Sequence, residues 1–139
     1  MNLTDHYRAY IACLNDRSWH QLGNFVDDNV HYNGELISLS GYRTMLENDV
    51  RIIPDLSFNI DFLVVEIPRV AARLVFDCSP QGRFLGQETR GQRITFSENV
   101  FYTFCDGKIV GVWSVIDKAA VERQLRGEPP AAVCADRSV

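Results

Sequence analysis

The residue best placed for acid/base chemistry is Asp117, an acid at the end of an apolar stretch. Ile109 to Ile116 has the composition of a strand and carries Trp113 shortly before the acid. A carboxylate in such surroundings can take a proton from the carbon next to a carbonyl group. Asp directly before Lys-Ala-Ala-Val-Glu is also a favoured helix N-cap. We therefore consider both a catalytic role and a capping role for Asp117.

A second acid, Glu98, interrupts the apolar strand predicted over Arg93 to Phe104. Phe96 and Val100 lie two residues to either side and share its face of the strand. On an inward face, a charge is costly unless it is paired or titrated. Glu98 is thus predicted to line a cavity or to form a salt bridge at an edge or a dimer interface, with Arg73 as its plausible partner.

Further ligand contacts are predicted from polar and aromatic side chains. His31 and Asn33 share one face of a short strand, Val30 to Asn33, and could donate hydrogen bonds to a substrate oxygen. Asn33-Gly34 is also a turn signal, which would explain the same residues without a ligand. Several aromatic residues are expected in the core, part of which would form a pocket wall. The predicted substrate-binding residues are His31, Asn33, Glu98, Trp113, Tyr102 and Phe96.

Composition limits the classes of protein to consider. The 139 residues are enough for one domain with its own core, and the net charge of −4 argues against a nucleic-acid partner. The apolar runs are too short to span a bilayer, and the N-terminus carries charges where a signal peptide would be apolar. The four cysteines are scattered and show no zinc-ligand spacing. We expect a cytoplasmic protein with reduced thiols and no metal, whose partner is a small neutral molecule or another copy of this chain.

Helical patterns fill the N-terminal part of the chain. Apolar residues recur at helical spacing over 3–16, and Ser18 can cap a second helix that ends at Asp27-Asp28-Asn29. A third helix is predicted from Ser40 or Gly41 to about Val50, with Tyr42, Met45 and Leu46 facing inward.

After Pro54 the period of the pattern changes from 3.6 to 2, which indicates strands. Asp106-Gly107 has the residue types of a two-residue hairpin turn between the last two strands. A short helix, Lys118 to Leu125, follows them. The predicted strands are Phe58 to Val64, Val70 to Cys78, Arg93 to Phe104 and Ile109 to Ile116.

Helices followed by strands indicate an α+β fold. Some strands are apolar on both alternations, so both faces of the sheet need cover. We predict a strongly curved sheet whose concave face packs on the helices and encloses a cavity, and whose convex face forms a homodimer. The predicted domain is 1–126, followed by a flexible tail over 127–139.

The order of the short motifs resembles one known family. With this order of elements, the chain resembles the SnoaL-like polyketide cyclases, or ester cyclases, of the nuclear-transport-factor-2-like (NTF2-like) superfamily, over about residues 3 to 126. The matching pieces are Asp27 to His31, Gly41, Pro54 to Leu56, Phe84 to Gly86, Asp106 to Val110, Trp113 with Asp117, and Gln124-Leu125.

The resemblance implies an NTF2-like cone fold and a cofactor-independent activity. Family members close rings by intramolecular aldol-type condensation, with an acid/base Asp at the position that Asp117 matches. Many relatives carry Gly-Thr-His-Thr-Gly where this chain has Cys78-Ser79-Pro80-Gln81-Gly82. The role of that histidine cannot be transferred to Pro80. The expected function is a cyclase or isomerase acting on a small, largely apolar carbonyl compound; the alternative is a non-catalytic binding or assembly module of the same fold.

Overall fold

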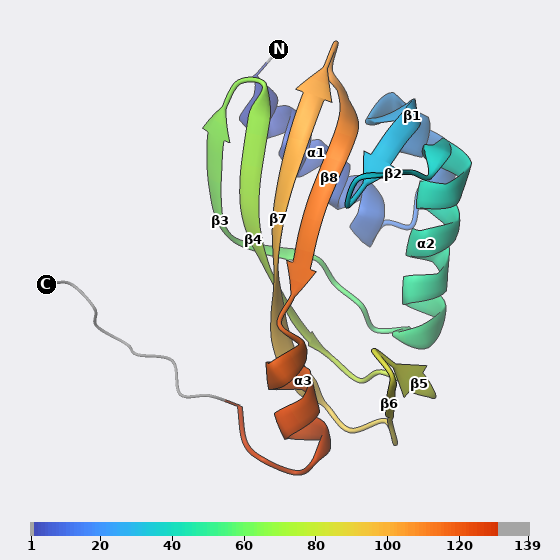
Figure 1. Ribbon diagram of the computed structural model, residues 1–139, viewed down its shortest axis with the longest axis vertical. Coiled ribbons are helices and arrows are strands. Elements are labelled where there is room, and N and C mark those ends of the chain that lie inside the picture. Colours follow the sequence, from blue (N-terminus) through green and yellow to red (C-terminus); the bar gives the residue numbers. More distant parts are fainter. Residues whose placement is uncertain (1, 131–139) are drawn as a thin grey trace, which may run out of the picture.

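The computed structural model describes residues 2–130 and shows helices packed on one face of a curved sheet (Figure 1). The six-stranded sheet has the strand order β2-β1-β8-β7-β4-β3, and β5 and β6 form a small separate sheet. In chain order the elements are α1 (Leu3–Asn15), the 3-10 helix η1 (Trp19–Asn24), β1 (Val26–Tyr32), β2 (Glu35–Leu36), α2 (Ser38–Ile52), β3 (Asn59–Glu66), β4 (Arg69–Cys78), β5 (Arg83–Phe84), β6 (Gln87–Glu88), β7 (Ile94–Cys105), β8 (Lys108–Ile116) and α3 (Lys118–Leu125).

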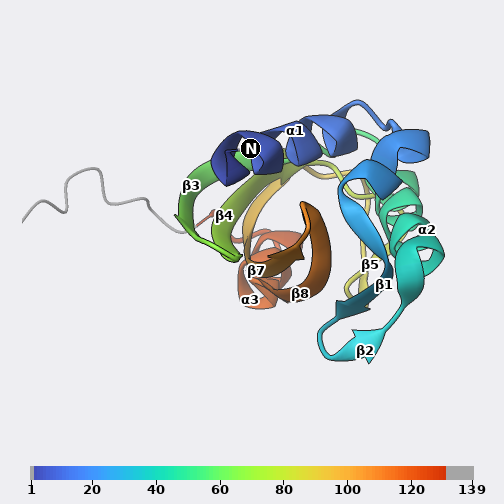
Figure 2. The same cartoon turned by 90° about the horizontal axis from the view of Figure 1, so that it is seen from above.

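Seen from above, the sheet curves around its inner face, with α1 across it and α2 beside β1 (Figure 2). The α+β fold class is therefore confirmed. No helix within residues 2–130 combines the length and the apolarity that a membrane span requires. The predicted tail begins with exposed residues, and its part from 131 to 139 lies outside the described residues.

The first predicted helix is confirmed as α1. Asn2 Oδ1 caps it by accepting a hydrogen bond from the backbone N–H of Asp5 at 3.3 Å. The predicted apolar stripe faces the core, where Tyr7 and Tyr10 are almost completely buried. This stripe fixes α1 against the inner face of the sheet.

The second predicted α-helix is wrong. Residues Trp19–Asn24 form a 3-10 helix in which Ser18 makes no side-chain cap, and the chain is already a strand from Val26. The run Asp27-Asp28-Asn29 consequently lies inside β1 instead of ending a helix. The physical reason is tertiary: β1 pairs in parallel with β8, and the N–H of Ile109 donates to the Phe25 carbonyl at 2.7 Å.

The last hairpin is confirmed together with its turn. Asp106 and Gly107 have φ values of 50° and 77°, as a two-residue turn with a twist matching its strands requires. The strands pair antiparallel with Phe101 opposite Trp113. Because β7 also pairs with β4 along its length, its alternation determines which side chains enter the core.

The period-two alternation predicted over Phe58 to Val64 holds only in part in β3. Asp61 is an extra residue in β3, because Ile60 lies opposite Leu74 while Phe62 already lies opposite Arg73. Beyond this β-bulge the inward positions shift, so Leu63 packs on the core while Phe62 is exposed.

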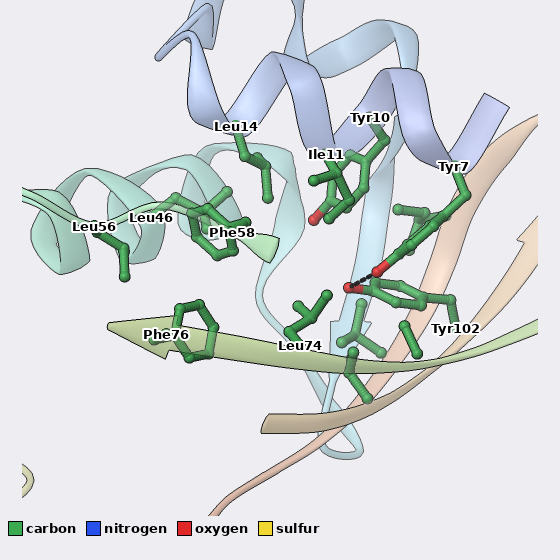
Figure 3. Packing of buried hydrophobic residues seen from close by; sticks show 14 of the residues in the cluster. Tyr7, Tyr10, Ile11, Leu14, Leu46, Leu56, Phe58, Leu74, Phe76 and Tyr102 are labelled. Atoms are coloured by element: carbon green, nitrogen blue, oxygen red, sulfur yellow. Dashed lines mark hydrogen bonds between the residues drawn. The ribbon is translucent and has the colours of Figure 1, made fainter. Parts of the chain in front are cut away.

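The two faces of the sheet are both apolar, but only the inner face is covered by helices. Figure 3 shows the inner face, where β4 and β7 residues pack against α1 and α2. The outer face carries large apolar side chains that are each more than half exposed, namely Phe62, Val64, Phe101, Trp113 and Val115. The expected two-sided apolar character is thus present on these strands.

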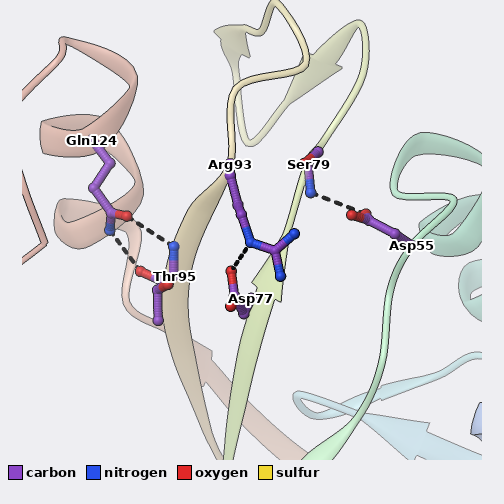
Figure 4. Close-up of polar contacts among 6 residues, drawn as sticks. All are labelled: Asp55, Asp77, Ser79, Arg93, Thr95 and Gln124. Atoms are coloured by element: carbon purple, nitrogen blue, oxygen red, sulfur yellow. Dashed lines mark hydrogen bonds and ion pairs between the residues drawn. The ribbon is translucent and has the colours of Figure 1, made fainter.

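The C-terminal helix docks through one polar side chain (Figure 4). Gln124 Oε1 accepts a hydrogen bond from the N–H of Thr95 at 2.8 Å, and Gln124 Nε2 donates to the Thr95 carbonyl at 2.6 Å and to the Ala120 carbonyl at 3.0 Å. Gln124 is only 8% exposed. The Gln124 side chain therefore hydrogen-bonds the backbone of Thr95 as a neighbouring strand would, just beyond the point where the pairing of β7 with β8 ends.

We predict that Gln124→Ala lowers the free energy of unfolding by about 2 kcal/mol, because the partly buried backbone groups of Thr95 lose their partners. Chemical denaturation measures the change. The control is Lys118→Ala, an exposed position on the same helix. Equal stability of both variants would show that the Gln124 contacts do not hold α3 in place.

Candidate functional site

A cavity of about 120 Å³ lies between α2 and the inner face of the sheet. Phenylalanine rings form much of its wall, and they contact one another: the ring centroids of Phe76 and Phe96 are 5.0 Å apart, and those of Phe84 and Phe96 are 5.6 Å apart. We call this part the phenylalanine tier; its lining residues are Tyr32, Met45, Asp49, Ile53, Leu56, Phe58, Phe76, Phe84, Phe96, Glu98 and Ile116.

A smaller hollow of about 40 Å³ adjoins it and is lined by tyrosines, so we call it the tyrosine tier. Tyr10, Tyr42 and Tyr102 line only this second part. Asp49 and Glu98 line both tiers. The two acids therefore lie where the phenylalanine tier meets the tyrosine tier.

Asp49 reaches the cavity from α2. It continues the helix face that carries the buried Tyr42 and Leu46. Burial, and secondarily the charge of Glu98, raises the pKa of Asp49 to about 7. No hydrogen bond to its carboxyl group occurs within residues 2–130. Near neutral pH this group can both take up and release a proton.

Glu98 reaches the cavity from β7. Burial raises its pKa, and the hydrogen bond that Ser114 Oγ donates to its carboxyl group opposes this effect. The salt bridge considered with Arg73 does not form, because Arg73 lies on the outer face opposite Asn99 and pairs with Asp61 at 3.0 Å. Glu98 is thus a cavity acid that has a hydroxyl group as its partner instead of a cation.

The buried tyrosines form two hydrogen-bonded pairs. The hydroxyl oxygens of Tyr10 and Tyr42 are 2.6 Å apart, and the Tyr7 hydroxyl donates to that of Tyr102 at 3.1 Å (Figure 3). Burial raises the pKa of all four side chains above the ordinary tyrosine value. These groups are therefore neutral phenols over the physiological pH range.

Half of the predicted substrate-binding residues meet in this cavity: Phe96, Glu98 and Tyr102 all line it. The others lie outside the lining. His31 is exposed and contacts the Asn29 carbonyl, and Asn33 accepts a hydrogen bond from the Ser114 N–H at 2.9 Å, which ties the turn to β8. Trp113 lies on the outer face and is 53% exposed.

Asp117 also lies outside the cavity lining, directly after the lining residue Ile116. Its carboxylate is exposed and caps α3 by accepting a hydrogen bond from the Ala120 N–H at 3.1 Å. The capping role is therefore present. Its catalytic role stays a prediction.

Asp49 and Tyr32 line the cavity but were not among the residues predicted from the sequence. A signal for Asp49 was available, because it follows Tyr42 by seven residues and Met45 by four on the same helix face. Tyr32 alternates with His31 and Asn33 along the strand, and it is the face of Tyr32 and Val30 that the sheet buries. Within residues 2–130, no group of three His, Cys, Asp or Glu side chains is arranged to hold a metal ion.

The raised pKa of Asp49 gives a prediction about stability. Below about pH 4 the carboxyl group is protonated in both the folded and the unfolded chain; between about pH 4 and pH 7 only the folded chain keeps the proton, so stability is lost as pH rises. We expect Asp49→Asn to be more stable than the parent at about pH 8, on the order of 4 kcal/mol, and equally stable near pH 4.

Denaturant unfolding at both pH values measures this difference. Glu47→Gln is the matched control, because Glu47 lies on the same helix but is exposed and paired with Arg43. A difference between Asp49→Asn and the parent that stays constant with pH would contradict the assignment.

Comparison with known proteins agrees with this architecture. A family model of the SnoaL-like polyketide cyclases matches residues 4–125. A SnoaL-like polyketide cyclase from Agrobacterium tumefaciens is 50% identical in sequence, with a TM-score of 0.88 over 90% of this chain and 98% of the other. No curated protein shows significant similarity.

Two distant structures share the fold. IdmH from Streptomyces antibioticus has 17% identity and a TM-score of 0.80, covering 91% of this chain and 99% of its own. TsrD from Streptomyces laurentii has 24% identity and a TM-score of 0.75, covering 88% and 91%. The family match over most of the chain confirms the resemblance seen in the motifs. This chain belongs to the SnoaL-like polyketide cyclase family.

Proposed function

We propose that this protein is a cofactor-independent cyclase or isomerase that acts by acid/base catalysis on a small, largely apolar carbonyl compound. The observation that carries the proposal is the Asp49 carboxyl group, which lines a largely apolar cavity and has a pKa of about 7. A base with such a pKa is suited to taking a proton next to a carbonyl group at neutral pH. Family membership supports the same class of reaction.

The proposed steps use only groups of this chain. Ionised Asp49 takes the proton from the carbon next to a carbonyl group, and an enolate forms. In a cyclase the enolate carbon bonds to a second carbonyl carbon of the same molecule, and the resulting alkoxide takes the proton that Asp49 carries. In an isomerase the substrate has a double bond between its β- and γ-carbons, so the enolate is conjugated with it, and Asp49 returns the proton to the γ-carbon. The cavity favours ring closure by holding the substrate folded.

Asp117 is the second candidate for the acid/base, since it matches the acid of the family motif. Its exposed capping position also favours the alternative function, a non-catalytic binding or assembly module. Pro80, which is buried where many relatives carry histidine, favours that alternative as well.

Proton exchange distinguishes these possibilities. With cyclohexanone in heavy water, we predict that the protein speeds deuterium incorporation next to the carbonyl group, with a rate that rises with pH through about 7 as Asp49 ionises. Asp49→Asn should lower the rate at least a hundredfold, because the amide cannot take up the proton. Proton NMR follows the exchange.

Asp117→Asn is the companion variant, because Asn caps a helix about as well as Asp and preserves the fold. Loss of exchange in this variant, with retention in Asp49→Asn, would transfer the base role to Asp117. Exchange no faster than in buffer for the parent protein would favour the binding module.

We also propose a homodimer formed through the outer face of the sheet. Its support is the group of exposed apolar side chains on β3, β7 and β8, since contiguous exposed apolar surface marks interaction sites. Light scattering at micromolar concentration should give twice the chain mass of 15.8 kDa. Trp113→Glu should shift the mass toward the monomer, whereas Lys108→Glu should not. A monomeric parent protein would refute the dimer.

A further inference from the structure

The tyrosine tier contains hydroxyl hydrogens that its own hydrogen bonds do not use. Tyr7 donates to Tyr102, which leaves the hydrogen of the Tyr102 hydroxyl available, and the bond between Tyr10 and Tyr42 uses one of their two hydrogens. No other hydrogen bond within residues 2–130 involves these hydroxyl groups. Two phenolic hydrogens thus remain for an acceptor on side chains that line this space of about 40 Å³.

The phenylalanine tier differs from it in chemistry and in size. It has a volume of about 120 Å³ and a mostly apolar wall. Together the two tiers are about as large as a cavity of roughly 150 Å³ that holds one benzene molecule. The cavity accordingly has room for one ring with a small polar group.

We infer that the substrate is a single-ring carbonyl compound that binds with its oxygen in the tyrosine tier, as acceptor from Tyr102 and the Tyr10–Tyr42 pair, and with its ring in the phenylalanine tier. This inference rests on the proposed function and specifies its substrate class. Tyr10, Tyr42 and Tyr102 would act as the donors that stabilise negative charge on that oxygen.

The position of the acids agrees with this orientation. Asp49 and Glu98 line both tiers, so they lie beside the boundary between oxygen and ring, where the carbon next to the carbonyl group would be. An ionised Glu98 would repel a developing enolate oxygen. Burial raises the pKa of Glu98, which favours its neutral form and reduces this repulsion.

The test uses cyclohexanone labelled with ¹³C at the carbonyl carbon. Hydrogen-bond donation to a carbonyl oxygen moves the ¹³C resonance downfield, so the bound ketone should show a downfield shift. Tyr102→Phe should remove much of this shift and weaken binding about tenfold. Tyr7→Phe is the matched control, because Tyr7 is equally buried but does not line the tyrosine tier; it should keep the shift. Circular dichroism verifies that both variants fold.

A two-ring ketone, 1-decalone, tests the size limit and should bind at least tenfold more weakly than cyclohexanone. An unchanged shift in Tyr102→Phe, or equal binding of the two ketones, would overturn the inference. These readouts need no turnover. A Tyr102-dependent shift without proton exchange would refute the proposed function and support the binding mode. Proton exchange without that shift would support the proposed function and refute the binding mode.

Discussion

The register of β7 is the constraint on which the site depends. Because side chains alternate along a strand, one register places Phe96, Glu98, Val100 and Tyr102 on the inner face and Asn99 and Phe101 on the outer face. A slip of one residue would move Glu98 and Tyr102 to the outer face. Pairing with β4 on one side and β8 on the other, together with the turn at Asp106-Gly107, prevents this slip. The cavity chemistry and the apolar outer face thus follow from the same backbone pairing.

The cavity concentrates polar groups where they are costly to bury. A carboxyl group or phenol in an apolar wall lowers stability unless it has a partner or stays neutral. The tyrosines satisfy this condition by pairing with each other, and Glu98 does so through Ser114. Asp49 has no such partner within residues 2–130, and its pKa of about 7 reflects this. Proteins retain groups of this kind at functional sites more often than elsewhere.

The sequence was sufficient to predict most of the fold, and half of the residues predicted to contact a ligand line the cavity. Predictions from local chemistry succeeded, such as the Asp106-Gly107 turn and the helix at Lys118–Leu125. Errors arose where tertiary pairing overrides local pattern: Val26 begins a strand because β8 lies beside it. The bulge at Asp61 likewise changed the inward face of β3 without any signal in the alternation. Residue types alone could not decide which face of the predicted strand Val30 to Asn33 is buried, the one with His31 and Asn33 or the one with Val30 and Tyr32.

The separation of Asp117 from the cavity acids has a structural cause. β8 ends at Ile116, which still lines the phenylalanine tier, and the next residue must begin α3 so that Gln124 can reach Thr95. The helix leaves N–H groups without partners at its start, and the Asp117 carboxylate accepts one of them. This acid follows the cavity-lining residue Ile116 directly, and its Oδ1 is directed at the helix. Asp117 thus accepts the Ala120 N–H through Oδ1 outside the cavity lining, whereas Asp49 and Glu98 line the cavity from α2 and β7.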